Sequence, residues 1–322
     1  MPGACYRFAD GGRPPRATAR SRTCDTVRMR ITVLAGGVGA ARFLRGLKAA
    51  APGAQITVIG NTGDDITLFG LRVCPDLDTV MYTLGGGINE EQGWGRADET
   101  FTIRDELRAY GAGPSWFTLG DRDFATHIVR TQLLAAGEPL SEVTRVLCER
   151  WQPGVRLLPM SDDTIETHVV LKDSVIHFQE WWVRLHAPAP AEAIAGADFV
   201  LFPPSNPVVS IGPILAVPGI REAVEAQTVV GVSGIIGSAP VRGMADVCLA
   251  TIGVQTSAAA VAAHYGADLI DGWLVDEQDK AAADDPALAG IAVRALPLYM
   301  RDLPSAAAIA QGAIDLALEL KR

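Results

Sequence analysis

Short, continuous apolar runs alternate with amphipathic stretches at both ends of this chain. Residues 30–35 (RITVLA) and 55–60 (QITVIG) are apolar runs of strand length, and residues 40–50 between them carry apolar side chains at helical spacing. Uniformly apolar runs of this length are typical of parallel strands that are buried on both faces. With the glycine-rich turn at 36–39, the order strand, turn, helix, strand predicts a Rossmann-like unit.

The same alternation returns in the second half of the chain. Residues 305–319 carry apolar side chains at helical spacing and are expected to form a terminal amphipathic helix. Four apolar runs are expected to be further strands, namely 198–202, 228–233, 268–275 and 291–295.

The middle of the chain has a different pattern. Segments 98–110, 123–136 and 141–151 carry apolar residues at helical spacing, whereas 156–177 returns to a strand-like pattern with Lys172-Asp173 as a hairpin turn. Alternating strands and helices on both sides of a helical stretch predict the α/β class. We expect a three-layer Rossmann-like parallel sheet with a helical insert, or cap, at roughly 98–151.

Composition supports one large domain and narrows the possible partners. The chain has 322 residues, 48% of them hydrophobic, which suits a single α/β domain over 29–322 with an ample core. The first 28 residues hold six Arg and two Asp, lack a signal sequence, and are expected to be a disordered extension. The net charge of −9 argues against nucleic acid as a partner.

Two further features concern location. No continuous apolar run reaches the ~18 residues that a membrane span needs, so we expect no membrane segment. The five cysteines are scattered without a C-x-x-C pair, which suits a reducing, cytoplasmic setting and no structural zinc.

Acidic residues follow the second predicted strand, close in sequence to the glycine-rich turn. Asp64 and Asp65 come directly after the strand, and Asp76 and Asp78 follow shortly afterwards. Open α/β sheets bind ligands at the carboxyl ends of their strands. Backbone N–H groups at a glycine-rich turn hold phosphate, and carboxylates hold the Mg²⁺ that neutralises it. The pattern therefore predicts a Mg²⁺ site and phosphoryl-type transfer on a nucleotide diphosphate.

These signals also have ordinary alternatives. The turn at 36–39 matches only part of the dinucleotide fingerprint, because Arg42 stands where the third glycine would be, and a nicotinamide-binding fold stays open. Two adjacent carboxylates argue against that fold, since they would repel a pyrophosphate unless a cation intervened. Asp76 or Asp78 could instead cap a helix that runs to about residue 84.

Polar and aromatic residues elsewhere are further candidates. Arg42 and Arg122 each lie near the start of a predicted helix and could hold an anion. Alternatively, Arg42 is a solvated helix residue, and Arg122 is a surface residue beside a helix cap formed by Asp121 or Asp123. Ser205 and Asn206 follow a strand and could bind a nucleotide, or form a plain turn. Trp94 lies in a glycine-rich loop and could contact a ligand, although tryptophans are more often core residues.

Seven stretches together resemble the 2-phospho-L-lactate transferase family over residues 29 to about 280. They are GGVGAARFLRG (36–46), NTGDD (61–65), CPDLDTVMYTLGGGINEEQGWG (74–95), LGDRDFATH (119–127), IHFQEWWVR (176–184), PPSNPVVSIGPIL (203–215) and VRGMAD (241–246). Members of this family make the F420-0 skeleton of coenzyme F420, and the actinobacterial members are phosphoenolpyruvate transferases.

The resemblance implies a particular reaction. The donor would be a guanosine diphosphate-linked enolpyruvyl or lactyl acid, and the acceptor the deazaflavin FO. The terminal ribityl hydroxyl of FO would attack the phosphorus that carries the acid, releasing GMP and leaving dehydro-F420-0 or F420-0. The resemblance also implies dependence on Mg²⁺ and a homodimer, and it leaves the choice of donor open.

The residue roles that follow from this resemblance are hypotheses. Asp64 and Asp78 would bind Mg²⁺, and Asp65 or Asp76 would orient or deprotonate the ribityl hydroxyl, so these four aspartates form the predicted catalytic set. FO would contact Asp64, Trp94 and Arg96. The residues expected to hold the donor are Gly36, Gly37, Gly39, Arg42, Arg122, Ser205 and Asn206.

Two other function classes are compatible with the same opening motif. A non-catalytic regulator that binds a UDP-sugar would share the glycine-rich turn and the fold, but it would not need the stretches PDLDTVMYTLGGG and GWG. An NAD(P)-dependent oxidoreductase would bind nicotinamide and need no Mg²⁺.

Overall fold

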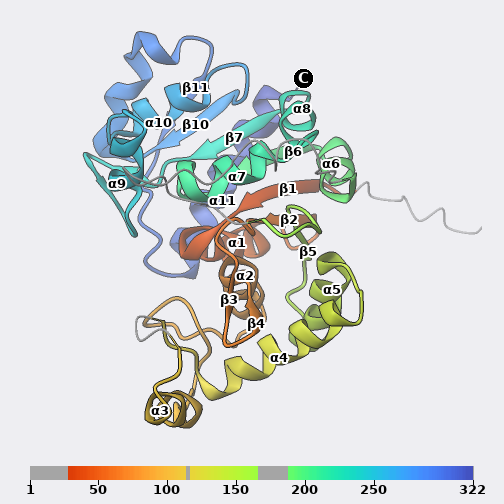
Figure 1. The fold of residues 1–322 in the computed structure, drawn as a ribbon. Helices are drawn as coiled ribbons and strands as arrows, with labels where there is room; N and C mark the ends of the chain where they lie inside the picture. The colour runs from red at the N-terminus through yellow and green to blue at the C-terminus, as the bar shows by residue number, and fades with distance from the viewer. Residues whose placement is uncertain (1–27, 114–116, 166–187, 322) are drawn as a thin grey trace, which may run out of the picture.

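A seven-stranded parallel sheet forms the centre of the protein (Figure 1). The structure is a computed structural model and describes residues 28–113, 117–165 and 188–321. The strand order is β11-β10-β7-β6-β1-β2-β5, and every neighbouring pair is parallel. The bounds are β1 Arg30–Ala35, β2 Gln55–Gly60, β5 Arg156–Pro159, β6 Phe199–Phe202, β7 Val229–Val232, β10 Gly272–Val275 and β11 Ala292–Ala295.

The strand order reverses direction at β1. From β1 the chain proceeds to β2 and β5 on one side, and it later returns to β6, β7, β10 and β11 on the other side. The loops that follow β1 and β6 therefore diverge at the carboxyl ends of two adjacent strands. Such a switch point leaves a crevice, where open α/β sheets bind their ligands.

Helices cover both faces of the sheet and give three layers. Side chains of β1 alternate between the two sides, with Val33 in one core cluster and Leu34 in the other. The first cluster is completed by α1 (Gly37–Ala50), α2 (Pro75–Leu84), α5 (Leu140–Trp151) and α11 (Leu303–Leu320). The second is completed by α6 (Pro188–Ala195), the π-helix η1 (Pro207–Ile211), α7 (Gly212–Ala216), α8 (Ile220–Glu225), α9 (Ala245–Thr251) and α10 (Ala258–Tyr265). The predicted α/β class and the three-layer parallel sheet are confirmed.

The helical stretch in the middle of the chain contains α3 (Thr102–Ala109), α4 (Asp121–Ala135) and α5. A small antiparallel hairpin of β3 (Ile66–Leu68) and β4 (Leu71–Val73), absent from the sequence prediction, packs with α4. This part has its own apolar cluster of Leu68, Val73, Leu119 and Phe124. The remaining elements are β8 (Ile235–Ile236), β9 (Ala239–Pro240) and the 3-10 helices η2 (Glu277–Asp284) and η3 (Pro286–Leu288).

The starts of α3 and α4 cap each other. The Asp121 carboxylate, at the beginning of α4, accepts hydrogen bonds from the backbone N–H groups of Thr102 and Ile103 in α3. The Glu99 carboxylate, just before α3, accepts from the backbone N–H groups of residues 122 and 123 in α4. Carboxylates at helix starts satisfy unpaired N–H groups and interact well with the helix dipole. The alternative that Asp121 or Asp123 caps its own helix is therefore wrong, because Glu99 performs that role.

Helix α11 is the one helix among the described residues that is long and apolar enough to cross a membrane by length and composition. Its buried residues, including Ile309, Ala313 and Ala317, belong to the central core cluster and pack beside α1. Core packing therefore explains why this helix is apolar.

Several sequence predictions lie outside the described residues. These are the N-terminal extension up to residue 27, the hairpin turn at 172–173 and the family stretch at 176–184. The predicted strands 30–35 and 55–60 agree with β1 and β2 at both ends.

Candidate active site

A cavity of about 480 Å³ opens at the switch point between β1 and β6. Its wall is formed by the loops that follow β1, β6 and β7, by residues 241–245 and by the segment 298–301 that precedes α11. A volume of this size lies within the usual range for sites that bind small molecules. Topology and cavity therefore agree on one candidate site.

Close packing of the backbone explains the glycines of the turn at 36–39. A Cβ at Gly36 would lie 2.5 Å from the Ser210 Cβ, and one at Gly39 would lie 2.3 Å from the Pro204 carbonyl oxygen. Gly37 has a φ of +75°, which disfavours other residues. The three glycines line the cavity, as their predicted role requires.

One N–H group of this turn already has a carboxylate partner. The Gly37 N–H donates to Oδ1 of Asp76 at 2.7 Å. The carboxylate of Asp76 is 5% exposed and thus lies under the turn, where it fixes the backbone. An incoming phosphate would therefore meet the later N–H groups of the turn and of the first turn of α1.

Ser205 and Asn206 form the opposite wall. The Ser205 hydroxyl donates to the Gly36 carbonyl oxygen at 2.8 Å and accepts from the Gly36 N–H at 3.3 Å, which ties the loop after β6 to the loop after β1. Asn206 Oδ1 accepts from the backbone N–H groups of Val208 and Val209 and caps η1. Both residues line the cavity, and both build its wall as well.

Two of the four predicted catalytic aspartates are bridged by one amide. The Asn61 Nδ2 group donates to Asp64 Oδ1 at 2.8 Å and to Asp76 Oδ2 at 3.0 Å. Asn61 itself is fully buried at the end of β2. The structure thus brings Asp64 and Asp76 together beside the glycine turn.

Asp64 differs from the other three aspartates in its exposure. It is the exposed member, whereas Asp65, Asp76 and Asp78 are at most 5% exposed. Its dense surroundings, and then repulsion from Asp76 and Asp65, raise the pKa of Asp64 to about 8. Burial also raises the pKa of Asp76, against the opposing hydrogen bonds from Asn61 and Gly37. Two crowded carboxylates, one reachable by solvent, form a site that favours a cation or a proton.

Asp65 points into the protein. It is 3% exposed, and its Oδ2 lies 3.3 Å from the Arg72 guanidinium. Burial raises the pKa of Asp65 to about 7, although a hydrogen bond with Cys74 and the charge of Arg72 oppose the rise. This geometry supports the loop that carries Asp64, and the role of Asp65 toward the ribityl hydroxyl stays a prediction.

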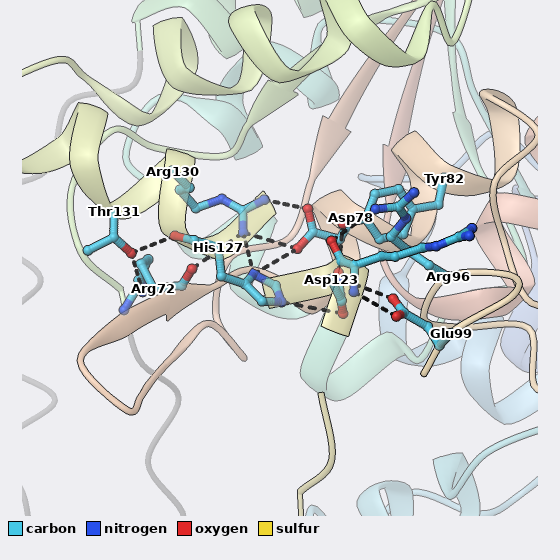
Figure 2. A network of polar contacts seen from close by, with 10 residues as sticks. Arg72, Asp78, Tyr82, Arg96, Glu99, Asp123, His127, Arg130 and Thr131 are labelled. Carbon is cyan, nitrogen blue, oxygen red and sulfur yellow. Dashed lines mark hydrogen bonds and ion pairs between the residues drawn. The ribbon is translucent and has the colours of Figure 1, made fainter. Parts of the chain in front are cut away.

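Asp78 belongs to a buried charged network (Figure 2) rather than to the pair of Asp64 and Asp76 beside the glycine turn. Both of its carboxylate oxygens accept hydrogen bonds from the Arg130 guanidinium. His127 Nδ1 lies 3.8 Å from Asp78, and His127 Nε2 lies 3.4 Å from Asp123. Arg130 thus engages both oxygens of Asp78, whereas Asp64 and Asp76 share one amide donor. The predicted metal pair Asp64 and Asp78 stays a prediction, and this geometry favours Asp64 and Asp76 beside it.

The positions of Asp76 and Asp78 also exclude the capping alternative. Cys74 is the N-cap residue of α2, and its side chain makes no capping hydrogen bond. Asp76 and Asp78 lie within the first turn of α2, where negative charge interacts favourably with the helix dipole.

The remaining predicted residues divide into two groups. Trp94 and Arg42 line the cavity. Arg96 stacks on Trp151, with 4.9 Å between its Cζ and the ring centroid, and donates to the Arg122 carbonyl oxygen at 2.9 Å. Neither Arg96 nor Arg122 lines the cavity, and none of the four aspartates does. The donor and FO roles predicted for the two arginines stay predictions.

Sequence reasoning missed several residues that the fold brings to the site. Arg242 donates to the Gln92 carbonyl oxygen and so ties the loop of Trp94 to the 241–245 segment. Tyr299 and Arg301 reach the cavity from the far end of the chain. Arg242 lies in the family stretch 241–246, which could have pointed to it, whereas no local pattern marks Tyr299 or Arg301.

The acidic pair fits a magnesium ion whose remaining ligands come from the substrate. Among the described residues, no group of three or more His, Cys, Asp and Glu side chains is arranged to hold a metal. Mg²⁺ usually takes one or two carboxylates and completes its shell with water and substrate phosphates. Asp64 and Asp76 beside a phosphate-binding turn match that requirement.

Comparisons with known proteins show which family the chain resembles. The family described as 2-phospho-L-lactate transferase CofD matches residues 31–287. The chain is 68% identical to the phosphoenolpyruvate transferase of Thermobifida fusca, covering 91% of this chain and 99% of that protein. It is 65% identical to the phosphoenolpyruvate transferase of Streptomyces griseus (91% and 100% covered) and 51% identical to that of Mycobacterium tuberculosis (90% and 99%).

A solved structure shows the same fold. A member of the UPF0052 family from Bacillus halodurans superposes with a TM-score of 0.55 at 16% identity, covering 89% of this chain and 99% of that chain. This likeness supports the Rossmann-like architecture. The sequence matches go further, and they establish that the chain is a transferase that belongs to the 2-phospho-L-lactate transferase CofD family.

Proposed function

We propose that this enzyme transfers a phosphoenolpyruvyl group from a guanosine diphosphate-linked donor to the deazaflavin FO, in coenzyme F420 biosynthesis. The relatives at 51–68% identity are phosphoenolpyruvate transferases, which favours the enolpyruvyl donor over the lactyl donor. The observation that carries the proposal is a glycine turn that lines the cavity at the switch point and whose Gly37 N–H is held by Asp76, which Asn61 links to Asp64.

The donor would lie along the cavity wall. Its phosphates would meet the turn at 36–39 and the start of α1, and the apolar recess lined by Phe202, Val232 and Tyr265 would receive the base. The clamp between Ser205 and Gly36 keeps the two loops at a fixed separation. Positioning of this kind supplies much of the rate enhancement in phosphoryl transfer, because the transition state is loose.

Asp64 would be the carboxylate that meets the acceptor. It is the exposed aspartate of the four, so a free carboxylate oxygen of Asp64 can accept the proton of the attacking hydroxyl. In the reaction the FO hydroxyl oxygen forms a bond to the phosphorus that carries the acid, the bond to the bridging oxygen breaks, and GMP leaves. The hydroxyl proton passes to Asp64. Trp94, on the rim of the cavity, is available to contact the deazaflavin ring.

Asp64 and Asp76 would hold Mg²⁺. The ion, when bound, would neutralise charge on the diphosphate during transfer. Asn61 would keep both carboxylates in place, since its amide donates to each of them.

The test is a turnover assay with purified protein, FO, Mg²⁺ and each guanosine-linked donor, read by mass spectrometry. The proposal predicts GMP and dehydro-F420-0, loss of both with EDTA, and loss of turnover by orders of magnitude in Asp64→Asn. Asp105→Asn, an exposed aspartate on α3, is the matched control and should keep full turnover. Absence of phosphodiester product with either donor would refute the proposal.

Two further expectations concern the setting. We propose a cytoplasmic location, because the folded core accounts for the apolar helix α11. We also propose a homodimer, as the family resemblance implies, and light scattering after size-exclusion chromatography would test it. A monomeric mass at micromolar concentration would contradict that expectation.

A further inference from the structure

A smaller polar pocket of about 280 Å³ adjoins the large cavity. Both share Arg42, Met300 and Arg301, so these residues form the partition between the two spaces. Arg42 comes from α1 and Arg301 from the segment that enters α11. The cavity therefore continues past the glycine turn into a region rich in guanidinium groups.

Neither shared arginine forms an ion pair with a carboxylate of the described residues, although Arg301 lies over the Tyr299 ring and its charge interacts with that of Asp302. Within the described part of the chain, the guanidinium groups of Arg42 and Arg301 form no hydrogen bond or ion pair. Arg45, in the same pocket, differs, since it pairs with Glu90 at 2.7 Å. Arginine is suited to bind phosphate and carboxylate oxygens through its forked N–H groups. Two such unpaired groups on one partition form a candidate anion subsite.

The remaining carboxylate of this pocket is already engaged. Asp302 Oδ1 accepts from the Ser305 N–H at 2.8 Å and caps α11. The pocket thus holds three arginines against Glu90 and Asp302, and its two unpaired charges are both positive.

The fold holds the two arginines in a fixed relation. A Cβ at Gly46 would lie 2.3 Å from the Ala306 backbone, so α1 and α11 cross in direct backbone contact there. Arg42 lies one helical turn before Gly46, on the same face of α1. Arg301 lies shortly before Ala306, and its backbone N–H donates to the Ser305 hydroxyl at 2.9 Å. The crossing therefore sets the separation of Arg42 and Arg301.

We propose that Arg42 and Arg301 together bind an anionic group of the donor, a phosphate or the carboxylate, beyond the groups held at the glycine turn. The inference rests on the proposed function, because it needs the donor to occupy the large cavity. It assigns a binding role to Arg301, which stands far from every glycine-rich or acidic motif of the chain. It also pairs Arg42 with Arg301 in binding this anionic group.

The test measures GDP affinity by calorimetry and the donor KM for Arg42→Gln, Arg301→Gln and Arg301→Lys. Arg294→Gln is the matched control, because Arg294 pairs with Glu319 on the surface of the same C-terminal segment. Loss of one charged hydrogen-bonding group should weaken binding of the anionic ligand about 10- to 100-fold. Arg301→Lys should recover part of it, since the charge is kept.

Comparing the two ligands identifies the anion. Weaker binding of both GDP and donor in Arg301→Gln would assign a phosphate, whereas unchanged GDP affinity with a raised donor KM would assign the carboxylate. GDP affinity and KM equal to those of Arg294→Gln would overturn the inference while leaving the proposed function intact. A wild-type protein that binds neither GDP nor donor would instead overturn the proposed function and this subsite together.

Discussion

Removing either partner of the buried Asp78–Arg130 pair should destabilise the protein strongly. The two side chains are 5% and 1% exposed as residues, and Arg130 donates to both Asp78 oxygens. Arg130→Met keeps most of the apolar stem but leaves the Asp78 charge buried without its main partner. Breaking a buried pair in this way costs about 3–5 kcal/mol. Asp78→Asn leaves the arginine charge uncompensated and should cost a similar amount.

The double variant separates charge pairing from packing. With both charges removed, the loss should be well below the sum of the single losses, giving a coupling of at least about 2 kcal/mol. Equilibrium unfolding in urea, followed by tryptophan fluorescence, gives each free energy. Arg145→Met is the matched control, since Arg145 pairs with Glu142 and Glu149 on the exposed face of α5 and should cost under about 1 kcal/mol.

The same variants test the role of Asp78 in the reaction. If Asp78 serves the fold, Asp78→Asn and Arg130→Met should lose stability together and lose turnover in proportion to the unfolded fraction. A stable Asp78→Asn protein without turnover, beside an active Arg130→Met protein, would restore the original prediction of a metal ligand. A cost for Arg130→Met no larger than that of Arg145→Met would refute the structural reasoning.

Three further changes follow from the site and its surroundings. The pKa of Asp64 rises from an ordinary value near 4 to about 8 on folding, so the stability of the protein should fall as pH rises between these values. In melting curves without Mg²⁺, Asp64→Asn should reduce this dependence of stability on pH. An unchanged dependence would contradict the prediction. Gly39→Ala should lower the free energy of unfolding by about 1–3 kcal/mol and weaken GDP binding, because its Cβ would lie 2.3 Å from the Pro204 carbonyl oxygen. Gly53→Ala, where a Cβ meets open space, is the control for both the stability and the binding measurement. Glu99→Ala should cost about 1–2 kcal/mol in urea unfolding, since it removes the cap of α4, and a loss no greater than that of the exposed Glu106→Ala would argue against it.

Local sequence patterns predicted the sheet well and the acidic site in part. The strands at 30–35 and 55–60 are mostly apolar, with Gly36 directly after the first and Gly60 at the end of the second, and β1 and β2 match them at both ends. The placement of the acidic stretch at the end of β2 followed from the same pattern. The hairpin of β3 and β4 escaped prediction because each strand has only three residues, too few to show a period.

Local sequence patterns could not predict which residues the aspartates contact. Asp76 and Asp78 are two residues apart on α2, yet they point to different surroundings, one toward Gly37 and the other toward Arg130. Arg130 lies on a helix with many exposed positions, where an arginine is usually solvated, and nothing in its neighbourhood marks it as buried. The choice between metal ligand and buried ion pair therefore depended on tertiary packing.

The reciprocal caps of α3 and α4 have a consequence for local opening. Helix α3 buries none of its residues, so its first turn depends on the carboxylate that α4 supplies, and the first turn of α4 depends on Glu99. If one helix start frays, the other loses its acceptor as well. The backbone amides of residues 102, 103, 122 and 123 should accordingly exchange with solvent as one cooperative unit, and a natural sequence that replaces Glu99 would be expected to alter Asp121 in step.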